Sequence, residues 1–89
     1  MLGLSITVTM DDGEEFVAEP TMGTLLRLER HFDLPSAINA LQDMKLEHLA
    51  WLAWECRRHS GVTVQEYKKW SLGLLGMEFN ADDPLAEPA

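Results

Sequence analysis

The stretch "LEHLAWLAWECRRHSG", Leu46 to Gly61, has the most apolar helical pattern in the chain and decides how the rest can pack. At about 100° per residue, its apolar side chains cover most of the circumference of a helix. Such a helix is either central in its domain or shared with a second chain. Basic residues before Gly61 are typical of a helix C-terminus. We therefore predict a central helix that begins near Gln42 or Asp43 and ends at Gly61.

The N-terminal residues predict a β-hairpin. In "LSITVTM", apolar residues alternate with Ser and Thr from Leu4 to Met10, as in a half-buried strand. "DDG" at 11–13 is a turn signal, and "EEFVAE" can return as a second strand with Phe16 and Ala18 inward. A two-stranded hairpin is marginal alone, so we expect it to lie on helices or to pair with another chain.

Further helices are predicted on both sides of the central one. Thr21 is a suitable N-cap for a helix through Phe32, and a short helix follows Pro35. Thr63 and Glu66 have the spacing of a capping box, which predicts the start of a last helix. The apolar stripe of that helix would consist of Tyr67, Trp70, Leu74 and Met77.

These elements predict an α+β fold, with an N-terminal β-hairpin followed by three or four packed α-helices. Residues 1–79 would form a single domain, because 89 residues suffice for one modest core. Residues 80–89, "NADDPLAEPA", are acidic and aperiodic, and they predict a flexible C-terminal tail.

The charge and composition exclude several classes of protein. The net charge is −8, and the acids gather at both ends of the sequence, which disfavours contact with nucleic acid. No apolar run approaches the roughly 20 residues of a membrane helix, and no signal peptide is visible. The single cysteine suits a reducing compartment. We expect a cytoplasmic protein with no membrane partner.

No residue pattern predicts catalysis or a metal site. His48, Glu55 and His59 share one side of the central helix, but His48 and Glu55 lie about 10 Å apart along its axis. One ion cannot span that distance, and Glu55 with His59 more simply makes a surface pair. Cys56 lies mid-helix, where no helix N-terminus stabilises a thiolate. We expect a binding protein, not an enzyme, with no cofactor and no metal.

The aromatic residues are the candidates for partner binding. Trp54 and Trp70 fit a core, whereas Trp51 lies opposite the apolar face of its helix and is predicted to face a partner. Because pattern alone does not separate core from interface, the predicted partner-binding set includes both kinds. The set consists of Trp51, Leu52, Trp54, Trp70, Phe16 and Phe32.

The order of segments resembles the small tail assembly chaperones of long-tailed bacteriophages and prophages. The segments are "DDGEEFVAEP", "LLRLERHFDL", "LEHLAWLAWECRRHSG" and "TVQEYKKW", and the resemblance covers about residues 5–75. "LAWLAW" with a basic end is the most telling segment. Tyr67 departs from the phenylalanine that the resemblance leads us to expect.

The resemblance implies a chaperone that binds the tape measure protein and keeps it soluble while the tail tube assembles. It also implies that the protein acts in the host cell cytoplasm, is absent from the mature virion and forms homo-oligomers. The chain would be the short form of a frameshifted pair, with the longer form and the major tail protein as further partners. The alternative from another class is a small acidic regulatory or inhibitor protein that binds a basic site on a partner.

Overall fold

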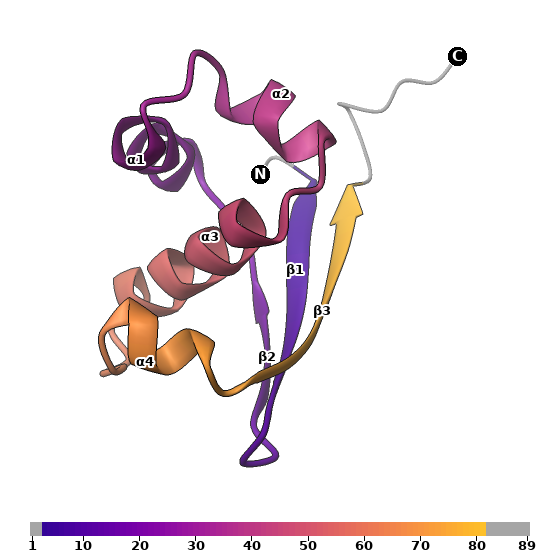
Figure 1. Ribbon diagram of the computed structural model, residues 1–89, viewed down its shortest axis with the longest axis vertical. Coiled ribbons are helices and arrows are strands. Elements are labelled where there is room, and N and C mark those ends of the chain that lie inside the picture. The colour runs from indigo at the N-terminus through magenta and orange to yellow at the C-terminus, as the bar shows by residue number, and fades with distance from the viewer. Residues whose placement is uncertain (1–2, 82–89) are drawn as a thin grey trace.

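The computed structural model describes residues 3–81, which contain one three-stranded antiparallel sheet and four helices. The strands are β1 (Leu4–Met10), β2 (Glu15–Ala18) and β3 (Leu74–Ala81). Their order is β2-β1-β3, so the N-terminal strand is central and the last strand forms an edge (Figure 1). The helices are α1 (Met22–Phe32), α2 (Ala37–Gln42), α3 (Leu46–His59) and α4 (Tyr67–Ser71).

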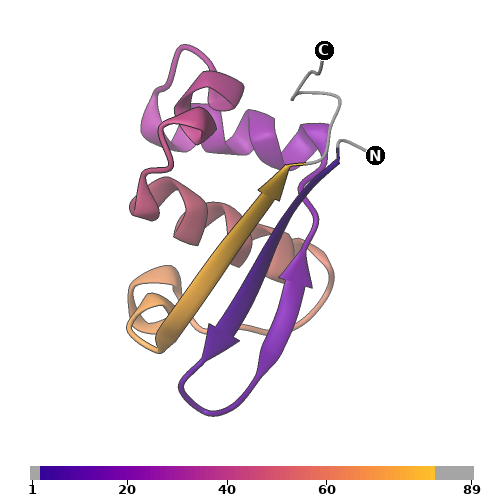
Figure 2. The same cartoon turned by 90° about the vertical axis from the view of Figure 1, so that its right-hand side faces the viewer.

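All four helices lie on one face of the sheet, and the other face is open (Figure 1, Figure 2). The predicted α+β class and the N-terminal β-hairpin are confirmed. The alternation of β1 explains the layering, because its apolar residues are buried while Ser and Thr on the outer face are only half-buried. No helix within residues 3–81 is long and apolar enough to cross a membrane.

The hairpin turn is held by its own residues. Gly13 has φ +93, a left-handed conformation that glycine adopts without strain. Its N–H donates to the Met10 carbonyl over 3.1 Å, and the Glu14 N–H donates to the Asp12 carboxylate over 2.9 Å. The turn sets the register in which Phe16 lies opposite Val8 and Ala18 opposite Ile6.

The prediction of a last helix through Met77 is wrong. That helix is a short α4, and residues 74–81 form β3 along the free edge of β1. A β-bulge explains the difference. Thr9 pairs with Gly76 and Met10 with Leu74, so Leu75 is an extra residue. The bulge separates the inward-facing Leu74 and Met77 by three residues, a spacing that imitates a helix.

The predicted capping box at Thr63 and Glu66 is also wrong, because α4 begins only at Tyr67. Glu66 is the N-cap residue and makes no side-chain cap hydrogen bond. The indole N–H of Trp54 donates to the Gln65 carbonyl over 2.9 Å, which holds the preceding segment in a non-helical path. The β-branched residues of that segment favour an extended backbone.

The other helix ends agree better with the sequence. Thr21 caps α1 in a capping box with Thr24, as the sequence predicts in part. The central helix begins at Leu46, a few residues later than predicted, because Met44 adopts a left-handed φ of 56 and interrupts the helical path. Gly61, with φ +97, follows the C-cap of α3, as expected for a terminating glycine.

The core lies between β1, α1 and α3. Ile6, Val8, Leu28 and Leu52 are each fully buried in it. The strand β3 runs to Ala81, two residues past the predicted domain boundary at 79, so residues 80 and 81 pair with β1. The remainder of the predicted tail, residues 82–89, lies outside the described residues.

Candidate functional site

The helices bury the central strand of the sheet more completely than they bury β3. The inward residues of β1 are between 0% and 7% exposed, and α3 contacts both β1 and β2. The inward residues of β3, Leu74, Met77 and Phe79, are only partly buried. Apolar side chains of β3 are therefore accessible from the helix side of the sheet.

A groove lies where α3, α4 and β3 meet. Its volume is about 370 Å³, and its lining is mainly apolar. From the helices it takes Leu46 and Ala50 of α3 and Tyr67 of α4, and from the strand it takes Leu75 and Met77. We call this the β3 groove. Met77 in its wall suits varied apolar ligands, because methionine is flexible and polarisable.

A second, larger hollow of about 980 Å³ adjoins the β3 groove, and we call it the aromatic hollow. The two share Glu47, Tyr67 and Ser71 in their walls. Trp54 links two other rings of the aromatic hollow, with its centroid 6.1 Å from Trp51 and 5.6 Å from Tyr67.

Polar contacts fix the aromatic side chains of this surface. The Tyr67 hydroxyl donates to the Glu47 carboxylate over 2.7 Å, which ties α4 to the first turn of α3. Burial, and then this hydrogen bond and the Glu47 charge, raise the pKa of Tyr67, so the phenol stays protonated and remains a donor. The guanidinium of Arg58 lies 5.0 Å from the ring centroid of Trp54. The side chains that line the site are therefore preorganised.

The rims of the two hollows carry the most exposed large apolar side chains of the described residues. Leu72 is 85% exposed, Leu46 71% and Leu75 69%. Leu72 borders the aromatic hollow, and the other two border the β3 groove. A contiguous apolar surface that contains hollows is typical of a protein-binding site. We call the two hollows and these three leucines the α4 surface.

The structure separates the six predicted partner-binding residues. Trp51 and Trp54 line the aromatic hollow, while Phe16 and Trp70 pack together elsewhere, with ring centroids 6.4 Å apart. Phe32 is half-buried, with its ring between those of His31 and His48. The six residues therefore do not form one surface.

The prediction that Trp51 faces outward is wrong for the isolated chain. Trp51 is 6% exposed, and its indole stacks on the His31 ring with centroids 4.6 Å apart. Residues of α1 thus cover the side of α3 that the sequence leaves open. Leu52 at 0% and Trp70 at 6% are buried as well, so among the six only Trp54, Phe16 and Phe32 offer substantial accessible surface.

Sequence reasoning missed the three exposed leucines. The helical pattern puts Leu46 on the buried face of the central helix, and Leu72 and Leu75 fall in the part of the predicted last helix that lies beyond the end of α4. The signal for Leu72 and Leu75 in the sequence is the run "SLGLLGM" at 71–77, which is apolar and interrupted by glycines. Such a run is compatible with several structures, so it does not identify a binding surface by itself.

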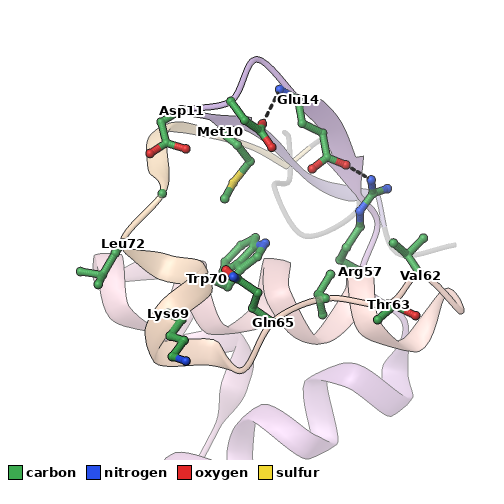
Figure 3. A pocket seen from close by; sticks show the side chains of 13 residues that line it. Met10, Asp11, Glu14, Arg57, Val62, Thr63, Gln65, Lys69, Trp70 and Leu72 are labelled. Atoms are coloured by element: carbon green, nitrogen blue, oxygen red, sulfur yellow. Dashed lines mark hydrogen bonds and ion pairs between the residues drawn. The ribbon is translucent and has the colours of Figure 1, made fainter.

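Another hollow, of about 470 Å³, lies between the hairpin turn and the segment before α4 (Figure 3). Met10 and Trp70 form its apolar floor, and the side chain of Arg57 is paired with Glu14 at its margin. The Asp11 N–H donates to the Gly73 carbonyl over 2.8 Å, which closes one end. Its lining contains both acids and bases, Asp11, Asp12, Glu14, Arg57 and Lys69, so this hollow favours no particular class of ligand.

The residues considered for chemistry on α3 have structural roles. Glu55 is fully buried and accepts from Arg27 over 2.6 Å and from Arg58 over 2.7 Å, so the expected surface pair with His59 is wrong. Burial raises the pKa of the Cys56 thiol to about 11, which keeps it protonated near neutral pH. Within residues 3–81, no group of three His, Cys, Asp or Glu side chains could hold a metal ion.

Comparison with protein families, with curated proteins and with solved structures finds no match to this chain.

Proposed function

We propose that this chain is a non-catalytic tail assembly chaperone of a long-tailed bacteriophage or prophage, which binds the tape measure protein during assembly of the tail tube. The proposal combines the segment order described above with the α4 surface. One observation carries it. The three most exposed large apolar side chains of the described residues, Leu46, Leu72 and Leu75, border two adjoining hollows.

The shape of the α4 surface suits a helical ligand. An amphipathic helix binds by laying its apolar face into a groove, with anchors at spacings of three and four residues. The β3 groove offers aliphatic walls, and the aromatic hollow offers the face of Trp54 beside Arg58. A long, helical and apolar tape measure protein would present many such segments. Several copies of the chaperone could then cover one ligand chain.

The net charge supports the same role. Binding an apolar protein creates a complex that tends to aggregate, and a net charge of −8 on each bound chain opposes this by mutual repulsion. Glu15 and Glu19 are exposed at the β2 edge of the sheet, and neither lines the β3 groove or the aromatic hollow. The charges therefore need not be buried when the apolar surface is covered.

The proposal is tested by co-expression with the tape measure protein encoded downstream of this gene, followed by size-exclusion chromatography with light scattering. We expect a soluble complex with many copies of this chain per tape measure chain. An insoluble tape measure protein, with this chain eluting alone, would contradict the proposal.

Two matched variants locate the binding surface. Leu46→Asp places an acid in the groove rim and should weaken binding about tenfold or more, as for an anchor at an interface. The fold should tolerate it, because an acid in the first turn of α3 interacts favourably with the helix dipole. Met22→Asp, at a 59% exposed residue in the first turn of α1, is the control and should bind like the wild type.

The acidic regulator remains as a second candidate, because the hairpin displays Asp11, Asp12, Glu14 and Glu15 on a folded element. The two functions differ in their response to salt. Binding of an acidic surface to a basic site weakens steeply as ionic strength rises, whereas apolar groove binding does not. A titration of the complex from about 0.05 M to 0.5 M salt separates them, since the Debye length falls well below 10 Å over this range.

A further inference from the structure

The two edges of the sheet differ in how well they are protected against pairing with another strand. The edge strand β2 has only four residues, of which Glu15 is charged, and it is flanked by Glu14, Glu19 and Pro20. Short length, charges and proline are the usual means of blocking an edge. The other edge strand, β3, has eight residues, no proline and a single charged side chain, that of Glu78. Beyond the bulge at Leu75, its outer edge is therefore open to pairing.

We propose that β3 pairs with β3 of a second copy of this chain, antiparallel and about a twofold axis. The result would be a six-stranded sheet in the order β2-β1-β3-β3-β1-β2. An antiparallel strand pair is self-complementary in its backbone hydrogen bonds, as an isologous interface requires. The dimer would also close the assembly, because in the sheet formed by residues 3–81 the edges left exposed are the two protected β2 strands.

Side-chain alternation restricts the register of this pairing. Residues directly opposite each other in an antiparallel pair point to the same face, so the twofold axis must pass beside one residue of β3. An axis at Glu78 would place two carboxylates face to face, which destabilises a strand pair. An axis at Gly76 would leave residues 79–81 without partners in the opposite strand. An axis at Met77 pairs residues 75–79, the regular part of the strand beyond the bulge, and avoids both defects.

The Met77 register also matches the apolar side chains. Leu75, which is 69% exposed, would lie opposite the partly buried Phe79 of the second copy, and the two Met77 side chains would meet at the axis. These residues lie on the helix side of the sheet, next to the β3 groove. On the other face, Glu78 would lie opposite Gly76. A Cβ atom at Gly76 would meet nothing within 4 Å, so the space there accommodates the carboxylate.

The inferred contact is apolar and backbone-mediated, while each chain carries a net charge of −8. Repulsion between two such chains is long-ranged at low ionic strength and is screened as salt is added. Dimerisation through β3 should therefore strengthen with salt. This distinguishes it from an association held by ion pairs, which salt weakens. The inference concerns the chain alone and does not rest on the proposed chaperone function.

The first test is sedimentation velocity of the purified full-length chain over a range of concentrations, at about 0.05 M and 0.5 M salt. We expect a monomer–dimer equilibrium whose dissociation constant falls at the higher salt. Leu75→Lys should raise that constant about tenfold or more, because it places a charge in the apolar row of the seam. Val17→Lys, at a 56% exposed residue of β2, is the matched control and should leave it unchanged.

A monomer at every concentration and salt would overturn the inference, as would a dimer that Leu75→Lys leaves intact. Circular dichroism of both lysine variants should match the wild type, since both side chains are largely exposed.

A disulfide test determines the register. In a Cys56→Ala background, Met77→Cys should form a covalent dimer under mild oxidation, because opposite Cα atoms about 4.5–5.5 Å apart lie within disulfide range. Glu78→Cys is the matched control. In the Met77 register, the Cα atoms of residue 78 in the two chains are about 8 Å apart, which is too far for a disulfide. A dimeric chain that cross-links through Glu78→Cys and not through Met77→Cys would overturn the pairing we propose.

Discussion

The central strand β1 and the edge strand β3 are neighbours in one sheet, yet their inward side chains differ in burial. Ile6 lies opposite Phe79 and Val8 opposite Met77, with both members of each pair on the helix side. The β1 residues are fully buried, whereas the β3 residues are partly buried. The contrast shows that an apolar residue on the inner face of a sheet is a core residue only where a helix covers it. The side chains of β3 are apolar in excess of what the monomer buries.

The largest effect on stability is expected at Trp51, which α1 covers. Trp51→Ala should destabilise the chain by about 3–5 kcal/mol, because it opens a cavity between α1 and α3 where the indole stacks on His31. Trp54→Ala, at a partly buried tryptophan of the same helix, is the control and should cost less. Urea denaturation followed by circular dichroism measures both. A Trp51→Ala chain as stable as the wild type would show that Trp51 is free to face a partner after all.

The contrast between β1 and β3 is measured directly by truncating one residue on each strand. Ile6→Ala should cost about 3 kcal/mol, since it removes a fully buried side chain and leaves a cavity. Met77→Ala should cost about 1 kcal/mol, because its side chain is partly exposed in the monomer. Denaturation at concentrations low enough to keep the chain monomeric gives both values. Equal costs would mean that β3 is as well covered as β1.

The elements that the sequence predicts best are those whose pattern has one interpretation. Strict alternation from Leu4 to Met10 indicates a strand, and the hydroxyl of Thr21 before an apolar helical repeat indicates an N-cap. Both are local effects that depend on few neighbours. The hairpin, α1 and the end of α3 at Gly61 are therefore predictable.

The third strand is not predictable in the same way. The bulge at Leu75 shifts the alternation by one residue and gives Leu74 and Met77 a helical spacing. Residues 74–81 form a strand because they pair with the free edge of β1, which lies far from them in the sequence. The site depends on this pairing, because the β3 groove exists only if residues 74–77 form a strand beside α4.

The ion pairs of the buried Glu55 with two half-exposed arginines are difficult to predict from the sequence for a related reason. The pair of Glu55 with Arg58 follows from their spacing on one helix, but Arg27 comes from α1 and reaches Glu55 only after the helices pack. The ion pair between Arg27 and Glu55 allows a test whose expected effect on stability is smaller. Arg27→Met should destabilise the chain by about 1–2 kcal/mol, since Glu55 is fully buried and keeps only one of its two charged partners.

The control for that change is Arg30→Met, at an exposed arginine of the same helix, which should alter stability by less than about 0.5 kcal/mol. Thermal denaturation at neutral pH compares the two. If both variants unfold at the same temperature, the contact between Arg27 and Glu55 contributes nothing measurable, as for an ion pair whose arginine is largely solvated.

The smallest effect on stability is expected for the thiol of Cys56, on α3. Burial, opposed in part by a hydrogen bond to Thr24, raises the pKa of Cys56 from 9.0 to about 11. Near pH 8 the folded chain should therefore react with iodoacetamide about 100-fold more slowly than the unfolded chain, because only the thiolate reacts. The unfolded chain in urea, at the same pH, is the reference for the rate.

The same shift predicts how stability depends on pH. Because the pKa is higher in the folded chain, the thiol of the unfolded chain ionises first as pH rises. The contribution of Cys56 to stability is thus fully present below about pH 9 and is lost progressively as pH rises from about 9 through about 11. Cys56→Ala removes this loss and leaves that of Tyr67 in place, so the difference between the two chains isolates the thiol. A difference that stays constant over this range would mean that Cys56 is as solvated as in the unfolded chain.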